Sequence, residues 1–232
     1  MTHPLTSRAI FGIGSKKVGS YLDIKGKMGQ RKPQSYDYFI VLDFEATCQK
    51  NIQLVPQEII EFPALKVNST TYEVETKFHQ FVKPVVHPQL TDFCKELTTI
   101  TQAEVDNASE FSKVMGDFRA WINSEMQGKS FIYVTCGDWD METMLPAQCR
   151  LSGEEVPDHC KSWVNIKKSY RNYTKHFARG LIEMLEGLGI GHTGTLHRGL
   201  DDCINILNIL RGLADRGVQF SPSNKCIQAR LS

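Results

Sequence analysis

Acidic side chains gather at three points of the sequence, and the first follows an apolar run. Residues 39–42 are apolar and precede Asp43 and Glu45, which stand two positions apart. Positions i and i+2 of a β-strand share one face, so these carboxylates would point together while Phe44 turns into the opposite layer. Two carboxylates about 4 Å apart repel each other by several kcal/mol at an intermediate dielectric. The pair is therefore either a solvated strand end or a site for a hard cation such as Mg²⁺ or Mn²⁺.

Two further acid groups and a histidine follow later in the chain. Asp138 and Asp140 come after an apolar strand, at the entrance to a helix. We predict that Asp138 is the N-cap of this helix and that Asp140 points back toward the sheet. An aspartate of the next pair, Asp201-Asp202, lies in the first turn of the last helix, where the helix dipole favours negative charge. His197, five residues before Asp202, lies on a glycine-containing loop that we expect to be free to move.

These side chains together could hydrolyse a phosphodiester. Two cations about 4 Å apart, bridged by Asp43 and Glu45, would stabilise both the attacking water and the leaving oxygen. A histidine has a pKa near neutrality, so His197 could accept the proton of that water. A lone histidine on a loop is most often only a surface residue, but here it accompanies acids.

Hydrophobic periodicity predicts the elements that position these residues. Apolar, β-branched runs predict strands at 39–42, 58–67, 75–82, 131–135 and 163–166. Helical spacing predicts helices from 101, where Thr101 and Glu104 match a capping box, from 110, and over 141–150, 181–188 and 200–214. The last helix is predicted to bury Ile204, Leu207, Leu210 and Ala214. This order predicts an α/β fold with a mixed five-stranded sheet: three antiparallel strands, then parallel ones, flanked by helices, with the first strand central.

Composition is that of one globular domain with a short appendage. The chain has 232 residues, 41% hydrophobic and 23% charged, with a net charge of +1. Residues 1–34 hold seven basic residues and one acidic residue, whereas the rest of the chain is mildly acidic. We expect a basic flexible arm over 1–35, a domain over 36–220 and a tail over 221–232. The arm is either a solvated leader or an attractor of phosphates.

Cysteine usage and hydropathy indicate the compartment. The seven cysteines form no CxxC pair and no Cys/His metal spacing, which is typical of reduced intracellular thiols. No apolar run is long enough to cross a bilayer, so we expect no membrane span. We predict a monomer of the cytoplasm or nucleus, although the acid-poor start is also typical of a mitochondrial presequence.

Three motifs resemble those of the DEDDh exonucleases in the DnaQ-like superfamily, which has an RNase H-like core. They are Asp43-Phe-Glu45, Trp139-Asp140 and His197 through Asp202. The segments LDFEATC, QEIIEFPALKV, PVVHPQLTDFC, TCGDWDM and HRGLDDCINI are similar to the Eri-type 3′→5′ exoribonucleases, the group with Snipper and the prion-interactor-like members. The resemblance covers about residues 36–220. It implies a nuclease that removes nucleoside 5′-monophosphates from RNA 3′ ends, with DNA as a second candidate substrate.

The resemblance also implies roles for single residues. Two Mg²⁺ ions, replaceable by Mn²⁺, would be held by Asp43, Glu45, Asp140 and Asp202, with His197 as general base. The 3′-terminal nucleotide would contact Glu45, Ala46, Thr47 and His197. Its base would stack on Phe93 and Trp139 and lie against Leu97 and Met141, since stacking on aromatic rings tolerates any base. Core packing is the alternative role for Phe93. Target choice would depend on the basic arm or on a protein partner.

The sequence departs from the exonuclease family at one position, and two other interpretations of its motifs are open. Many relatives have glycine where this chain has Thr99, so a turn with positive φ would strain Thr99. Asp43-Phe-Glu-Ala-Thr47 and Asp201-Asp202 also resemble motifs of haloacid-dehalogenase phosphatases, although those enzymes have aspartate where this chain has Glu45. The third interpretation is a nuclease fold kept only as a nucleic-acid-binding or protein-binding module.

Overall fold

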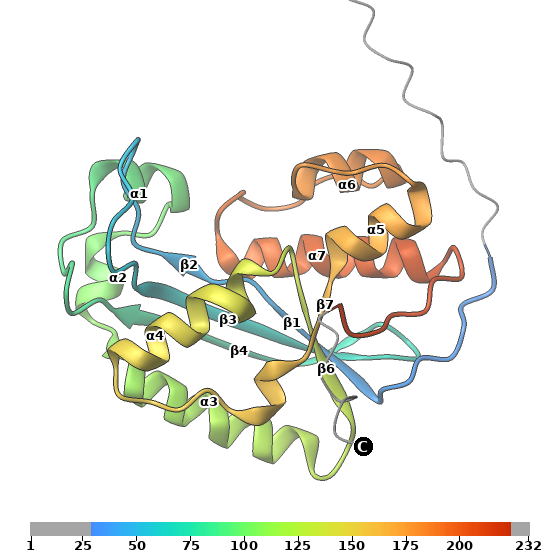
Figure 1. The fold of residues 1–232 in the computed structure, drawn as a ribbon, viewed down its shortest axis with the longest axis horizontal. Helices are drawn as coiled ribbons and strands as arrows, with labels where there is room; N and C mark the ends of the chain where they lie inside the picture. The colour runs from blue at the N-terminus through green and yellow to red at the C-terminus, as the bar shows by residue number, and fades with distance from the viewer. Residues whose placement is uncertain (1–28, 224–232) are drawn as a thin grey trace, which may run out of the picture.

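A mixed β-sheet lies between two layers of helices (Figure 1) in this computed structural model, which describes residues 29–223. The strand order in the sheet is β5-β4-β3-β1-β6-β7, and β2 pairs with β3. The strands are β1 (Tyr38–Leu42), β2 (Glu45–Ala46), β3 (Ile59–Asn68), β4 (Val74–Lys83), β5 (Ser109–Glu110), β6 (Phe131–Thr135) and β7 (Trp163–Asn165). The five longer strands are the five that the sequence predicts, and β2 and β5 add two residues each.

The first strand is central, as predicted. β1 pairs antiparallel with β3 and parallel with β6, and β6 pairs parallel with β7. The side chains of residues 39–42 are almost fully buried on both faces because helices cover both sides of the sheet. The parallel pairing of β1 with β6 brings their carboxyl ends to the same edge of the sheet, where ligand sites of α/β folds gather.

Helices divide between the two faces and one end of the sheet (Figure 1). α3 (Phe111–Met126), the π-helix η1 (Trp139–Met144) and α4 (Leu145–Leu151) pack on one face through a core that includes Ile40, Leu42 and Phe62. α6 (Leu181–Leu188) and α7 (Gly199–Ala214) pack on the other, with α5 (Ile166–Thr174) beside them. α1 (Asp92–Thr98) and α2 (Gln102–Asp106) cover one end of the sheet, and a 3₁₀-helix spans Asp158–Lys161. The predicted capping box of Thr101 and Glu104 begins α2.

Two helices, α1 and α5, were not predicted, and one predicted burial was wrong. α5 was not predicted, because it is mostly polar and buries only Ile166 and Tyr170, which stand four positions apart. Ile204 of α7 is 38% exposed, contrary to its predicted burial. The buried stripe of α7 runs through Cys203, Ile206 and their helical successors, so Ile204 falls at its edge.

Both ends of the described chain meet near the end of α7. The backbone N–H of Gly29 donates to the carbonyl of Asp215 at 2.7 Å, and Arg31 forms a salt bridge with Asp215 at 2.6 Å. Gln34 accepts a hydrogen bond from the backbone of Phe220. Residues 29–35 therefore lie against the domain, whereas the rest of the predicted arm, 1–28, and most of the predicted tail, 224–232, lie outside the described residues. The six cysteines within 29–223 are free thiols, and no helix there is long and apolar enough to cross a membrane.

Candidate active site

The first acid pair lies where β1 ends, but not within one continuous strand as expected. β1 ends at Leu42, and Glu45 begins β2, whose pairing with β3 shifts register between Glu45 and Ala46. The faces are nevertheless as predicted. Phe44 packs edge-on against Phe62 at 4.7 Å between ring centres, within the core on the α3 side. Asp43 lies on the α7 side, where it lines a cleft.

Asp140 points back toward this strand end, as predicted. Its Oδ1 accepts a hydrogen bond from the backbone N–H of Phe44 at 2.9 Å, and the side chain is buried. It stands in the π-helix η1, an irregular turn of a kind often associated with functional sites. Asp138 occupies the N-cap position, but the prediction that its side chain caps the helix was wrong. Asp138 instead accepts from Trp163 Nε1 at 3.0 Å and pairs with Lys168 at 2.8 Å.

The start of α7 brings His197 and Asp202 together. The backbone N–H of His197 donates to Asp202 Oδ2 at 2.8 Å, whereas Asp202 Oδ1 is buried and has no hydrogen-bond partner among the described residues. Single ligand atoms of Glu45, His197 and Asp202 all lie within 4.8 Å of one another. Asp201 has a different task, because it accepts from the backbone N–H of Thr195 at 2.8 Å.

The loop that carries His197 is held in place, contrary to the expectation that its glycines leave it free. Asn205, buried in α7, accepts from the backbone N–H of Thr193 at 3.0 Å and donates to the Thr193 carbonyl at 2.7 Å. Asp201 and Asp202 hold the following positions through the bonds just described. The loop therefore presents the imidazole from a fixed backbone, with φ of His197 at 61°.

Glu61 is a buried acid of the site that the sequence reasoning missed. Its carboxylate, fully buried in β3, accepts from the backbone N–H of Gly199 at 3.0 Å and contacts His79 Nε2 at 2.8 Å. A Cβ at position 199 would lie 2.7 Å from the carbonyl oxygen of Asp43, closer than real Cβ atoms come. Gly199, which has no side chain, thus allows α7 to approach the end of β1 closely, and the hydrogen bond to Glu61 holds α7 in that position. The sequence does mark this residue, because Glu61 stands inside the apolar run of residues 59–65, and a charged residue is rarely buried unless it has a partner.

Burial raises the pKa of the four acids, and neighbouring carboxylates add to the shift for Asp43, Glu45 and Asp202. Burial, followed by the charges of Asp140 and Glu45, raises the pKa of Asp43 well above its ordinary value. Burial, together with Asp202 and Glu61, raises the pKa of Glu45 to about 9. Burial also raises the pKa of Asp140 and of Asp202 to about 6. Such shifts mark a cluster of negative charges that the protein alone does not neutralise.

This donor set fits divalent cations. Carboxylate oxygens are the ligands that hard cations prefer, and Asp202 Oδ1 is a buried acceptor without a partner in the described chain. A cation among these oxygens would reverse the repulsion that raises their pKa. His197 stands beside Glu45 and Asp202, and burial lowers its pKa, so the imidazole is neutral near pH 7.

A cleft of about 500 Å³ opens at this point. Asp43, His197 and Asp202 line it, so three of the five predicted catalytic residues share one cavity. Lys167 of α5 and Arg179, before α6, line its other wall. Neither of these cations was predicted as a site residue. The available signal was the stretch 167–179, which contains basic residues and no acid.

The predicted base-pocket residues lie outside this cleft, and their role stays a prediction. Phe93 and Leu97 stand one turn apart on α1 and are half-exposed, and Trp139 is 39% exposed. Met141 and Ala46 are buried in the core on the α3 side. Thr47 is tied to β3, since its Oγ1 accepts from the backbone N–H of Glu58 at 3.0 Å.

Thr99, at the C-terminal end of α1, adopts the left-handed backbone conformation. It ends that helix with φ 58° and ψ 10°. A β-branched residue rarely enters this region of backbone conformation. The turn with positive φ, at which threonine must adapt or strain, is therefore present. Its carbonyl accepts from Arg198 Nη1 at 3.2 Å, which links α1 to the residue before α7.

A mixed sheet with buried acids at the end of its central strand, and a histidine on the loop before the last helix, defines the nuclease class with an RNase H-like fold. The family model described as Exonuclease (RNase T) matches residues 40–210. This chain belongs to that family. The haloacid-dehalogenase interpretation is therefore wrong, because the matching family is that of the exonucleases.

Known relatives agree with this assignment. The chain is 49% identical over 197 residues to ERI1 exoribonuclease 3 of Homo sapiens, and the aligned region covers 83% of this chain and 58% of that protein. It is 41% identical over 236 residues to 3′-5′ exoribonuclease 1 of Mus musculus, covering 98% of this chain and 68% of that protein. The crystallographic structure of the nuclease domain of 3′hExo, a DEDDh family member bound to rAMP, superposes with a TM-score of 0.80 at 39% identity. That match covers 84% of this chain and all of the other.

Proposed function

We propose that this protein is a 3′→5′ exoribonuclease that depends on Mg²⁺ and releases nucleoside 5′-monophosphates. The observation that carries the proposal is the buried, unpartnered Asp202 Oδ1 next to Glu45 and His197 within a cluster of mutually repelling acids. The names of the relatives support the same activity, although the chain spans only 58% of the length of ERI1 exoribonuclease 3.

Each residue of the site has a task in this proposal. Asp43, Glu45, Asp140 and Asp202 would hold two divalent ions, which, when bound, supply positive charge to the attacking water and the leaving oxygen. His197 accepts the proton of the attacking water, because burial lowers its pKa and keeps its imidazole neutral near pH 7. Its fixed backbone keeps the imidazole beside the acids throughout the reaction.

The terminal nucleotide would be held by a second group of residues. We propose that its base stacks on Phe93 and Trp139, with Leu97 and Met141 beside it, and that Glu45, Ala46, Thr47 and His197 contact the sugar and phosphate. The partial exposure of Phe93 and Trp139 supports this role over core packing.

The test is a paired degradation assay. A 5′-labelled single-stranded RNA and a DNA of the same sequence are incubated with the protein, with Mg²⁺, Mn²⁺ or EDTA, and products are resolved by length. We expect stepwise shortening of RNA from its 3′ end with Mg²⁺, and none with EDTA. Asp43→Ala abolishes shortening, and His197→Ala reduces it by about 10²- to 10⁴-fold while metal still binds. Equal degradation by wild type and Asp43→Ala would refute the proposal, and binding without cleavage would favour the binding-module interpretation.

A further inference from the structure

A basic, aromatic segment borders the cleft. Residues 167–179, here called the α5–α6 segment, contain five basic residues and no acid: Lys167, Lys168, Arg171, Lys175 and Arg179. The partly buried Tyr173 and the exposed Phe177 lie between them, whereas Tyr170 is buried in the core. Basic residues interleaved with aromatic ones are the composition with which proteins hold single-stranded nucleic acid.

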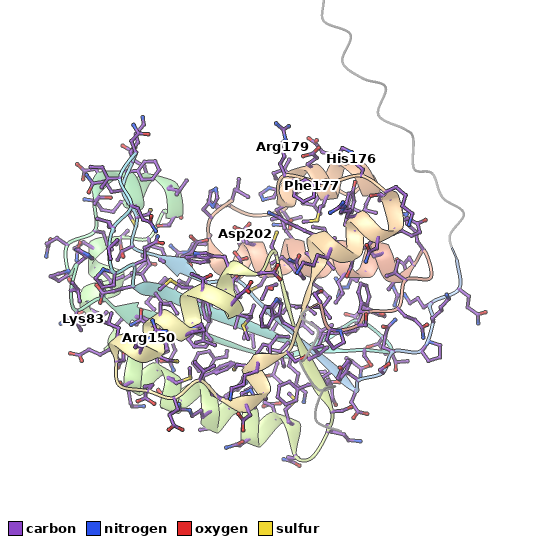
Figure 2. All side chains as sticks on the ribbon, in the orientation of Figure 1. Lys83, Arg150, His176, Phe177, Arg179 and Asp202 are labelled. Atoms are coloured by element: carbon purple, nitrogen blue, oxygen red, sulfur yellow. The ribbon has the colours of Figure 1, made fainter. Side chains whose placement is uncertain are left out.

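The two ends of this segment meet at the cleft. Lys167 Nζ donates to the carbonyl of Arg179 at 3.0 Å, and both residues line the cleft together with Asp43. The surface of the segment is therefore continuous with the acid cluster. Figure 2 shows Arg179, Phe177 and His176 on this side of the molecule, above Asp202.

The middle of the segment points into solvent. Phe177 is 62% exposed, although phenylalanine side chains are usually buried in the core. Arg171 and Lys175 are also exposed, and the guanidinium of Arg171 lies 6.0 Å from the centre of the Phe177 ring. An exposed ring near the Arg171 guanidinium offers a stacking face next to positive charge.

Two of the neighbouring acids already have partners in the protein. Glu183 of α6 pairs with His176 at 2.9 Å and with Arg179 at 3.3 Å, and Asp138 pairs with Lys168 at 2.8 Å. Within residues 29–223, no salt bridge joins Lys167, Arg171 or Lys175 to a carboxylate. Arg171 and Lys175 therefore have no salt-bridge partner among the described residues, while the charge of Lys167 also acts on Asp140 at the active site.

We propose that the α5–α6 segment binds the single-stranded RNA that leads into the active site, upstream of the terminal nucleotide. Phosphates of this RNA lie along Lys167, Arg171 and Lys175, and one unpaired base stacks on Phe177. A duplex offers no free base face to that ring, so the surface suits a single strand. The inference rests on the proposed function and extends it from the reacting nucleotide to the rest of the substrate.

The experiment compares a long substrate with a short one. Phe177→Ala and the double variant Arg171→Ala/Lys175→Ala are assayed on a 12-nucleotide single-stranded RNA and on a dinucleotide that reaches only the cleft. The matched control is Lys83→Ala/Arg150→Ala, which removes two exposed cations from β4 and α4, away from the segment (Figure 2). The same 12-nucleotide RNA, fluorescently labelled, is titrated in EDTA and followed by anisotropy over a range of salt concentrations.

We expect Phe177→Ala to weaken binding of the 12-nucleotide RNA by about 5- to 150-fold, the range for loss of one stacked base. The double variant should flatten the slope of log K against log salt by about 1.4, since each phosphate contact on a single strand contributes about 0.7. Dinucleotide hydrolysis and the control variant should match wild type. Unchanged binding and slope in both segment variants would overturn the proposal, as would an equal loss on the dinucleotide, which would mark a purely structural role. If wild type hydrolyses neither substrate, the proposed function fails, while anisotropy still decides the binding surface.

Discussion

Strand β3 carries a buried charge toward each end, and the protein treats the two differently. Near one end, Lys66 Nζ lies 3.2 Å from Glu75 and 3.2 Å from Glu125, and 4.3 Å from the centre of the Tyr38 ring. Near the other end, Glu61 lies among Asp43, Glu45 and Asp202. It contacts His79 and two backbone N–H groups, and the charge of Arg198 also acts on it. At the end of β3 near Lys66, here called the lysine end, carboxylates neutralise the buried positive charge. At the end near Glu61, here called the acid end, negative charge is in excess.

The pKa shifts express the same difference. Burial opposes the charge of Lys66, but hydrogen bonds to Glu125 and Glu75 more than offset it and raise the pKa of the lysine, so its charged form is stabilised. At the acid end the pKa values rise as well, but for carboxyl groups this means that the charged form is destabilised. A buried charge that has partners of opposite charge is compatible with a stable fold. A group of buried carboxylates without such partners is instead stabilised when a cation binds among them.

The largest effect is expected for Asp202→Asn. Loss of this carboxylate should reduce RNA hydrolysis by at least about 1,000-fold, since metal stabilisation of the transition state amounts to several kcal/mol. Thermal stability without metal should not fall, because one repelling charge is gone. Rates of single-turnover hydrolysis and melting curves in EDTA measure the two effects. The matched control is Asp201→Asn, which changes the neighbouring residue on the same helix turn; an equal loss of activity there would contradict the special role of Asp202.

Glu61→Gln should have the next largest effect. The amide holds the start of α7 less well than the carboxylate, so Asp202 and His197 lose their alignment. We expect a fall of about 10- to 100-fold in kcat and a higher Mg²⁺ concentration for half-maximal activity, the scale typical of residues that support metal ligands. Glu58→Gln is the control, because Glu58 is an equally buried acid of the same region that instead accepts from the backbone of Val85, Val86 and His87. If both variants lose activity alike, the role of Glu61 is only structural.

Without metal, stability should fall as the pH rises from about 6.5 to about 8.5. Carboxyl groups with a pKa raised in the folded state bind more protons folded than unfolded, so stability is lost above their ordinary pKa and up to the folded value, about 9 for Glu45. We expect the melting temperature in EDTA to drop by about 5 °C, given about 2–4 °C per kcal/mol for a domain of this size. Mg²⁺ should remove most of this dependence, and a flat profile in EDTA would disprove the claim that the acids repel one another.

Lys66→Met should have the smallest effect and only on stability. The substitution leaves Glu75 and Glu125 without their shared cation but partly exposed to water. We therefore expect the free energy of unfolding to fall by about 2 kcal/mol. Activity and Mg²⁺ dependence should stay as in wild type, because Lys66 lies toward the other end of β3. Urea denaturation and the RNA assay measure both. A changed Mg²⁺ dependence would show that the two ends of the sheet are coupled.

Local sequence patterns were enough for the main elements of the fold. The apolar run before Asp43 predicted a central strand, and the spacing in α3 and α7 predicted amphipathic helices that the structure contains. The side-chain period of a strand also placed Phe44 and the acids on opposite faces, because this alternation survives the break between β1 and β2. Polar α5 escaped prediction, since only two of its residues face the core.

The tertiary structure alone decided how these elements form a site. Which aspartate of the pair faces Glu45 depends on the rotation of α7, and the sequence left this open between Asp201 and Asp202 until the family resemblance was considered. Glu61 and Gly199 are 138 positions apart, so no local pattern could join them. Hydrophobic periodicity follows from residues that are neighbours along the chain, whereas the electrostatics of a buried site arise from segments that only folding brings together.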